Sequence, residues 1–374
     1  MSLMGTSDGS VVGMTQVIDH GDAARRWNLV ILSEGYRRNE LSQFQSDVQN
    51  FLSRMYQSSP FDELWCAINV YRIDVSSTDS GADDPTACGG TGASPNTYFD
   101  ATFCGDGQIR RLLTVNDSIV HSVVNQYMPQ AHMIMVIVNS TIYGGSGGGI
   151  ATFSLASGAA EIALHEMGHT AFSFADEYEY YAGCGVDPPG SHDQYTGGEP
   201  GQPNVTINTN RVTNKWSDLI LASTPMPTTS NANCAQCDPQ PNPFLASTVG
   251  TYEGAYYYHC GVYRPQFNCR MRALNNPYCA VCQRVIRQTL APYMDSWTWG
   301  TATIGPKETQ RWWLWWPNYP GFEVIGVQAM TPGDELRFER PGFQLNVDGS
   351  ATHYITVSNP TTDTVLFHFR GKRL

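Results

Sequence analysis

Two histidines and a glutamate stand at a spacing that can bind a metal ion and activate water. The run from His165 to His169 reads His-Glu-Met-Gly-His. Residues four apart project from one face of a helix, so a helix over residues 161–172 would let both imidazoles bind one ion. Glu166 lies beside the ion rather than on it and can accept a proton from activated water. The motif indicates a zinc-dependent hydrolase, with a peptidase as the first expectation. The alternative is a surface helix with two unrelated histidines.

The third ligand is marked less clearly. A catalytic zinc ion usually takes three protein ligands and keeps one position for water. Asp176 is seven residues beyond His169, which is about 10 Å along an unbroken helix. The helix must therefore break between residues 172 and 175, although no Gly or Pro stands there. We predict Asp176 as the third ligand. The alternatives are Glu177 first and then Glu179, His192 and His259. If Asp176 and Glu177 do not bind the metal, we expect them to orient a ligating imidazole.

Composition limits the class of protein. The 374 residues are 41% hydrophobic and only 15% charged, with 35 Gly and 22 Pro, which is typical of a loop-rich extracellular enzyme. The net charge of −12 argues against nucleic acid or an anionic membrane as a partner. No apolar run approaches the roughly 18 residues of a membrane span. No leader is visible, and residues 1–3 resemble a cloning remnant, so we interpret 1–24 as remnant plus N-terminal extension. We expect an extracellular or periplasmic protein.

The ten cysteines support that compartment. Their number is even and six lie between residues 234 and 282, which favours disulfides. Cys88 and Cys104 are close enough in sequence for a local bridge. The competing interpretation is a second, structural zinc ion held by two Cys-x-x-Cys pairs, Cys234, Cys237, Cys279 and Cys282. The long interval between the pairs makes disulfides the preferred interpretation.

Alternating strands and helices must position the motif. The sequence predicts strands at 29–33, 68–75 and 133–139 and helices at 38–56 and 108–127. A Gly-Ser hairpin at 144–149 precedes the metal-binding helix and is either a mobile rim over the cleft or a plain surface loop. We therefore expect an α/β or α+β zincin-like catalytic domain, with a mixed sheet beneath the metal-binding helix.

The rest of the chain divides into an irregular segment and a β-rich end. Residues 183–243 are rich in Pro, Asn, Thr and Gly and are expected to form a wall of the substrate cleft. A helix at 280–294 would close a catalytic domain spanning 25–295. Six strands, at 301–304, 310–316, 321–329, 335–340, 353–358 and 364–370, then predict a small all-β sandwich domain over 296–374. We place its Trp312, Trp313, Trp315 and Trp316 in the core, with ligand binding as the alternative.

Several segments together resemble the bacterial IgA-peptidase family of zinc metallopeptidases. The similarity is strongest from the His-Glu-Met-Gly-His motif through Asp176-Glu177-Tyr178. It continues, over about residues 25–290, in the segments 29–36, 67–70, 79–85, 203–206, 215–216, 261–265 and 269–272. The resemblance implies a secreted zincin-type endopeptidase acting on proteins or peptides, with His165, His169 and Asp176 as zinc ligands and Glu166 as general base.

One segment of this resemblance concerns the floor of the site. Cys269-Arg-Met271-Arg resembles the methionine turn beneath the metal of related zincins, where a soft thioether packs under the histidines. The alternative is an ordinary core methionine. The chain departs from metzincins at Phe172, where those proteins usually carry Gly, so the resemblance to that wider group is partial.

Peptide hydrolysis also needs a group that stabilises the oxyanion. We predict Tyr178 for this role, with Tyr181, Tyr263 and Arg270 as alternatives. A second hypothesis is a non-catalytic protein that retains the zinc site and binds glycans or surfaces through its Trp-rich C-terminal domain, and a third is hydrolysis of a non-peptide amide. Glu166 argues against the second hypothesis because a structural site needs no base.

Overall fold

The computed structural model describes residues 8–294, 296–316, 323–331, 333–347 and 350–372. Residues 1–3 and the first two residues of the strand expected at 321–329 lie outside this part of the chain. Contacts divide the chain into two units, Met1–Leu290 and Ala291–Leu374, and each is described by itself. The predicted domain limits of 25–295 and 296–374 remain predictions.

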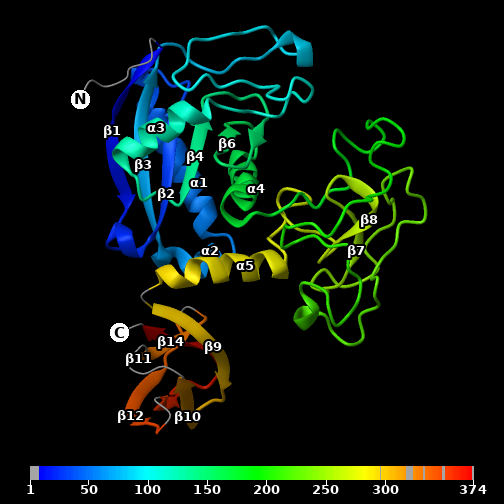
Figure 1. Ribbon diagram of the computed structural model, residues 1–374. Helices are drawn as coiled ribbons and strands as arrows, with labels where there is room; N and C mark the ends of the chain where they lie inside the picture. Colours follow the sequence, from blue (N-terminus) through cyan, green and yellow to red (C-terminus); the bar gives the residue numbers. More distant parts are fainter. Residues whose placement is uncertain (1–7, 295, 317–322, 332, 348–349, 373–374) are drawn as a thin grey trace. The chain divides into compact units, whose positions relative to one another are not determined.

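A six-stranded mixed sheet is the frame of the first unit (Figure 1), in the order β1-β3-β2-β4-β6-β5. Its strands are β1 (Gly9–Ile18), β2 (Trp27–Glu34), β3 (Ile68–Ser77), β4 (Met133–Val138), β5 (Gly145–Ser146) and β6 (Ala151–Ser154). The four inner strands are parallel and the two outer strands are antiparallel to them. Every residue of β2 and β4 is buried, as expected for parallel strands covered on both faces. The mixed sheet with helices confirms the α+β class.

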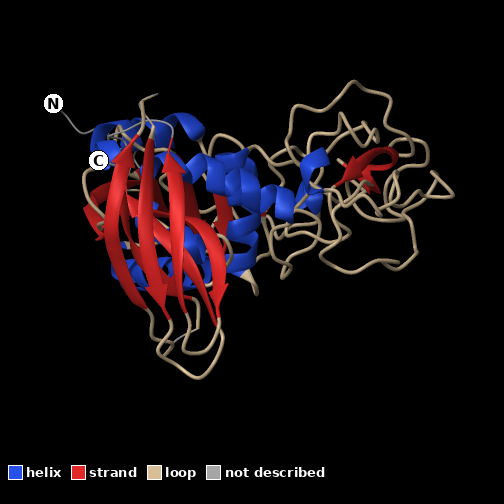
Figure 2. Ribbon diagram, turned by 90° about the horizontal axis from the view of Figure 1, so that it is seen from below, coloured by secondary structure: helices blue, strands red, loops and turns tan. Residues whose placement is uncertain are grey.

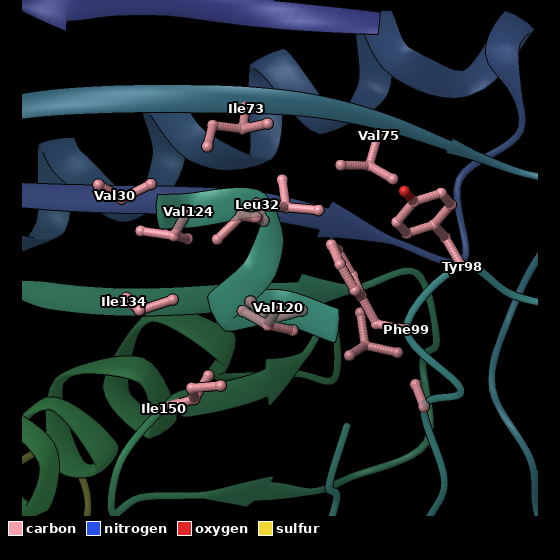
Figure 3. Packing of buried hydrophobic residues seen from close by; sticks show 14 of the residues in the cluster. Val30, Leu32, Ile73, Val75, Tyr98, Phe99, Val120, Val124, Ile134 and Ile150 are labelled. Carbon is pink, nitrogen blue, oxygen red and sulfur yellow. The ribbon is translucent and has the colours of Figure 1, made fainter. Parts of the chain in front are cut away.

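Helix α3 (Asp117–Tyr127) covers one face of this sheet. Side chains alternate between the faces of a strand, so Val30 and Leu32 of β2 point to the same side. There they join Ile134 of β4 and Val120 and Val124 of α3 in one buried apolar cluster (Figure 3). Burying such side chains stabilises the fold by about 1.5–3 kcal/mol each.

The opposite face carries α1 (Leu41–Tyr56) and α4 (Ala159–Phe172). Phe51 of α1 packs on Phe153 of β6, with ring centroids 5.8 Å apart. Phe172, the last residue of α4, stacks on Trp27 of β2 at 6.3 Å. These contacts hold the predicted metal-binding helix against the sheet.

Two predicted helices are wrong in extent. Residues 108–116 are not helical, because Asn116 caps α3 by accepting a hydrogen bond from the Ile119 backbone N–H. Leu112, in the preceding segment, instead forms a bridge to Gly145. The helix expected at 280–294 ends earlier: α5 is Ala280–Leu290, and a 3-10 turn, Ala291–Tyr293, follows. Pro292, in that turn, has no N–H to continue an α-helix.

Residues 183–243 are mostly irregular, as predicted, and such loops are drawn in tan in Figure 2. Two short antiparallel strands, β7 (Tyr252–Ala255) and β8 (Tyr258–Arg264), form a hairpin beyond this segment. Three disulfides are present: Cys88–Cys104, which confirms the predicted local bridge, Cys184–Cys237 and Cys234–Cys260.

The alternative zinc site at Cys234, Cys237, Cys279 and Cys282 is wrong. Cys234 and Cys237 are each bonded to another cysteine, and a disulfide sulfur is not the thiolate that zinc binds. Cys279 and Cys282 lie elsewhere, buried at the start of α5.

The second unit contains two three-stranded antiparallel sheets, β10-β13-β12 and β11-β14-β9. Their bounds are β9 (Ser296–Ile304), β10 (Thr309–Trp316), β11 (Glu323–Ala329), β12 (Arg337–Leu345), β13 (Ala351–Ser358) and β14 (Val365–Lys372). Both sheets contribute to one apolar cluster, for example Ile355 of β13 and Phe367 of β14.

The tryptophans of β10 divide between the two faces of the strand. Trp312 packs against Phe369, with ring centroids 5.3 Å apart, as the core prediction requires. Trp313 and Trp315 are 69% and 51% exposed, so the core prediction is wrong for them. The Trp316 side chain lies outside the described residues.

No helix in the described part of the chain is long and apolar enough to cross a bilayer.

Candidate metal centre

Helix α4 presents His165 and His169 together and then ends. Its last helical residue is Phe172, and Ser173 takes a left-handed conformation, with φ 55° and ψ 35°. Glycine usually fills this position at a helix end, which is why the sequence carried no signal for the break. The Phe174 N–H donates back to the Gly168 carbonyl at 3.0 Å, and the chain reverses toward the two histidines.

The reversal brings Asp176 to the two imidazoles. Its Oδ1 lies 3.0 Å from His165 Nε2 and 3.3 Å from His169 Nε2. The two Nε2 atoms are 3.2 Å apart. Three potential ligand atoms thus form a small triangle, and all three residues line a cleft. The side chains remain partly accessible, at 12% for His165 and 18% for His169.

The hydrogen bonds around the triangle suit a metal ion. His165 Nδ1 lies 3.0 Å from the Arg270 carbonyl, and His169 Nδ1 lies 2.7 Å from the Phe174 carbonyl. A carbonyl only accepts, so each Nδ1 carries the proton and each Nε2 keeps a lone pair directed at the triangle. Asp176 Oδ1 is buried and accepts no well-directed hydrogen bond. Two imidazole nitrogens and one orphaned carboxylate oxygen fit a three-ligand metal site with an open position.

Tyr257 holds the carboxylate from the far side. Its hydroxyl donates to Asp176 Oδ2 at 2.6 Å, which leaves Oδ1 for the site. A backbone hydrogen bond joins the same two segments: the Tyr256 N–H donates to the Asp176 carbonyl at 3.0 Å. Sequence reasoning missed Tyr257, which is 81 residues away in the chain and has no motif spacing to the histidines.

Electrostatics within the triangle favour positive charge. Burial acts to lower the pKa of both histidines, but the Asp176 carboxylate outweighs it, raising the pKa of His165 and raising that of His169 from 6.5 to about 9. Burial acts to raise the pKa of Asp176, but the two histidines hold it well below its usual range. The site therefore attracts cations, either protons or a metal ion that competes with them.

Glu166 lies beside the triangle, buried but facing the cleft. Burial raises its pKa, while the two histidines oppose the shift. The glycine-rich stretch expected at 144–149 packs against it. A Cβ on Gly145 would lie 2.9 Å from Glu166 Oε1, and one on Gly147 would lie 2.6 Å from the Cβ of His169. These glycines allow the backbone to approach the helix closely.

Met271 packs against helix α4 at Gly168, which lies between the two histidines in the sequence. It is fully buried, and a Cβ on Gly168 would lie 2.5 Å from its sulfur. The methionine therefore packs against α4 between His165 and His169, the place expected from the methionine-turn resemblance. Its carbonyl accepts the Glu177 N–H at 2.8 Å.

The alternative third ligands lie away from the triangle. Glu177 is turned toward buried cysteines. Glu179 forms an ion pair with Arg272 at 3.1 Å. His192 stacks on Tyr181 at 5.7 Å, and His259 Nδ1 lies 2.8 Å from the Cys234 carbonyl.

The cleft holds about 870 Å³. Of the predicted oxyanion groups, Tyr178, Tyr181 and Arg270 line it. Arg270 also forms a buried ion pair with Glu161 at 3.1 Å. Tyr263, on β8, instead lies 3.3 Å from Glu253. The cleft adds Arg111, a lining cation that sequence reasoning missed; among the described residues it forms no ion pair, and it donates to the Tyr181 carbonyl at 2.9 Å.

Comparison with known proteins agrees with this geometry. The family described as IgA Peptidase M64 matches residues 15–237 and 241–290, well over half of the chain. None of the curated proteins matches it. The match covers β2, helix α4 with His165 and His169, the reversal to Asp176 and the turn at Met271. The chain therefore belongs to the IgA peptidase M64 family and is a metallopeptidase, a hydrolase that depends on a bound metal ion and acts on proteins.

Proposed function

We propose that this protein is a secreted endopeptidase of the zincin type, in which His165, His169 and Asp176 hold a catalytic zinc ion. The observation that carries the proposal is the convergence of three ligand atoms, within 3.3 Å of one another, beside Glu166 in an open cleft. When bound, zinc polarises the scissile carbonyl and lowers the pKa of a water molecule toward about 7.

Glu166 would act as general base. It lies one residue round the helix from His165, at the cleft surface of the site. A carboxylate there can take the proton of the attacking water and deliver it to the departing amine. Its close packing against Gly145 and Gly147 holds the carboxylate in place.

Tyr178 and Arg111 are the two groups that we propose for the developing negative charge. Both line the cleft. Tyr178 is half-buried and stacks on Tyr180, with ring centroids 5.0 Å apart, so its position is restrained. Arg111 is not neutralised by an ion pair within the described residues, unlike Arg270 and Arg272, whose guanidinium groups meet Glu161 and Glu179. Removing one such donor typically costs about 10²–10³-fold in kcat.

The remaining features suit an extracellular enzyme. Three disulfides are stable in an oxidising compartment. We also propose that residues 296–374 form a β-sandwich accessory domain, since their two antiparallel sheets share one apolar cluster. Glycan binding by this domain gains no support from the family match.

The decisive experiment is hydrolysis of a denatured protein by Glu166→Gln. We expect a loss of about 10²–10⁴-fold in kcat/KM, the usual contribution of a general base, with unchanged zinc content. Glu308→Gln, at an exposed glutamate of the second unit, is the matched control and should retain full activity. Wild-type activity in the Glu166 variant would rule out the mechanism.

A further inference from the structure

Three cysteines and one carboxylate meet in the interior behind the catalytic cleft. Glu177, Cys269, Cys279 and Cys282 each place a ligand atom within 4.8 Å of all the others. All four residues are buried, with at most 2% exposure. They come from three separate places: the chain after α4, the turn before Met271 and the start of α5. No predicted site used this combination.

The spacing matches a tetrahedral metal site. Cys269 Sγ lies 3.9 Å from Cys282 Sγ, and Glu177 Oε1 lies 3.7 Å from Cys282 Sγ and 3.9 Å from Cys279 Sγ. With zinc–sulfur bonds of about 2.3 Å and zinc–oxygen bonds of about 2.0 Å, tetrahedral edges are about 3.8 Å between sulfurs and about 3.5 Å between sulfur and oxygen. The observed distances need only a small contraction around an ion.

The hydrogen bonds favour anionic ligands. The Cys279 N–H donates to Cys269 Sγ at 3.2 Å, and the Cys282 N–H donates to Cys279 Sγ at 3.4 Å. Asn204 donates to Glu177 Oε1 at 2.9 Å and orients the carboxylate. Glu177 Oε2 is buried with no hydrogen-bond partner. Among the described residues Glu177 forms no ion pair, so its charge lacks the direct cationic partner that burial normally demands.

A disulfide explains this cluster less well. The Sγ atoms of Cys269 and Cys282 are too far apart for the bond of about 2.05 Å, whereas six other cysteines of the chain are paired. Joining any two of the three thiols would also leave the third thiol and the Glu177 carboxylate buried together. A divalent cation compensates all four groups at once.

We propose that Glu177, Cys269, Cys279 and Cys282 bind a second, structural metal ion, a thiophilic divalent cation for which zinc is the best match. The site is closed on all sides, as structural zinc sites are. The contacts of its residues indicate a structural role. Glu177 follows Asp176 directly, and its N–H donates to the Met271 carbonyl at 2.8 Å. The ion ties the reversal after α4 to the turn that also supplies the Arg270 carbonyl to His165.

Cobalt substitution separates this site from the catalytic one. Tetrahedral Co²⁺ bound by thiolates absorbs strongly through sulfur-to-metal charge transfer, whereas a His-His-Asp site has no thiolate. We expect this band in full-length wild-type protein and in His169→Gln, and its loss in Cys279→Ser together with one metal equivalent by elemental analysis. A missing band in wild type and His169→Gln would overturn the proposal, whatever the peptidase activity of either protein.

Alkylation mapping tests the proposal on unaltered protein, in case the cysteine variant fails to fold. Cys269, Cys279 and Cys282 should resist iodoacetamide in the native protein and become labelled after denaturation with a chelator, without reductant. Cys88, in a disulfide, is the control and should need reduction. If any of the three cysteines also needs reductant, they form a disulfide and the metal site is wrong.

Discussion

Asp176 and Glu177 are neighbours in the chain, yet their side chains enter two different environments. Asp176 meets two imidazoles at the floor of an open cleft. Glu177 meets three thiols in the closed interior. Nitrogen and oxygen ligands with an open position are typical of catalytic zinc, and a closed, sulfur-rich set is typical of structural zinc. Access, as well as ligand type, therefore separates a site for chemistry from a site for stability.

The two centres also share support. The Arg270 carbonyl accepts a hydrogen bond from His165 Nδ1. Of its two neighbours, Cys269 belongs to the buried cluster and Met271 packs against α4 at Gly168. A change in the buried cluster should therefore reach the proposed catalytic ligands through the backbone of this turn. The reverse effect should be small, because α4 is also held by the sheet.

Exchanging the two acids for their amides should give opposite results. Asp176→Asn should lower peptidase activity more than about 10²-fold, through lost metal affinity, and should destabilise the protein less than the exchange at Glu177. Glu177→Gln should lower the free energy of unfolding by several kcal/mol, since a structural ligand is lost. Activity assays and calorimetry on both variants measure the contrast.

The Glu177→Gln experiment has an outcome that would contradict the buried metal site. Without a metal ion, Glu177→Gln would replace a buried, uncompensated carboxylate by a neutral amide and would stabilise the protein. A higher melting temperature of Glu177→Gln than of wild type would thus contradict a metal site at Glu177.

The pH dependence of stability should differ with and without catalytic metal. In metal-free protein His169 has a pKa raised from 6.5 to about 9, so its charged form stabilises the fold fully below pH 6.5. That stabilisation, about 3 kcal/mol, is lost as the pH rises through 9. Metal-loaded protein should lack this loss because the ion replaces the proton. Chelator-treated His169→Gln is the control; a pH-dependent loss equal to that of wild type would exclude His169 as its source.

Tyr257→Phe should weaken the catalytic centre alone. It removes the hydrogen bond to Asp176 Oδ2, and loss of such a partner typically costs about 10–100-fold in metal affinity or activity. Titration with zinc in a competing chelator measures the affinity. Tyr256→Phe, which changes the adjacent phenol, should leave it unchanged; equal effects would indicate general loosening of this loop.

Ser173→Gly should have the smallest effect. At φ 55° a side chain is strained, so glycine should raise the free energy of unfolding by about 0.5–1 kcal/mol. Ser173→Val should lower it and, by disturbing the reversal, lower activity. Thermal melts measure both. A destabilised glycine variant would mean that the serine side chain itself, rather than the backbone conformation, ends the helix.

The elements with strong local patterns were predictable. The apolar run in β4 and the periodic residues of α1 and α4 appear where the sequence placed them. The helix at 108–127 was overextended because a capping hydrogen bond at Asn116 outweighs the apolar spacing before it. Of the cysteines, only the short Cys88–Cys104 pair was predictable, since longer pairings depend on how the chain returns.

The two histidines and the glutamate can be identified from their spacing in the sequence, because that spacing follows from helix geometry. The sequence also predicts Asp176 as the third ligand, with Glu177, Glu179, His192 and His259 as alternatives. Only the tertiary structure brings one of these candidates, Asp176, to the two imidazoles. A left-handed serine reverses the chain, Tyr257 arrives from 81 residues away to hold Asp176, and three distant cysteines surround Glu177. These contacts have no local pattern, since the packing of the sheet, α4 and α5 brings them together.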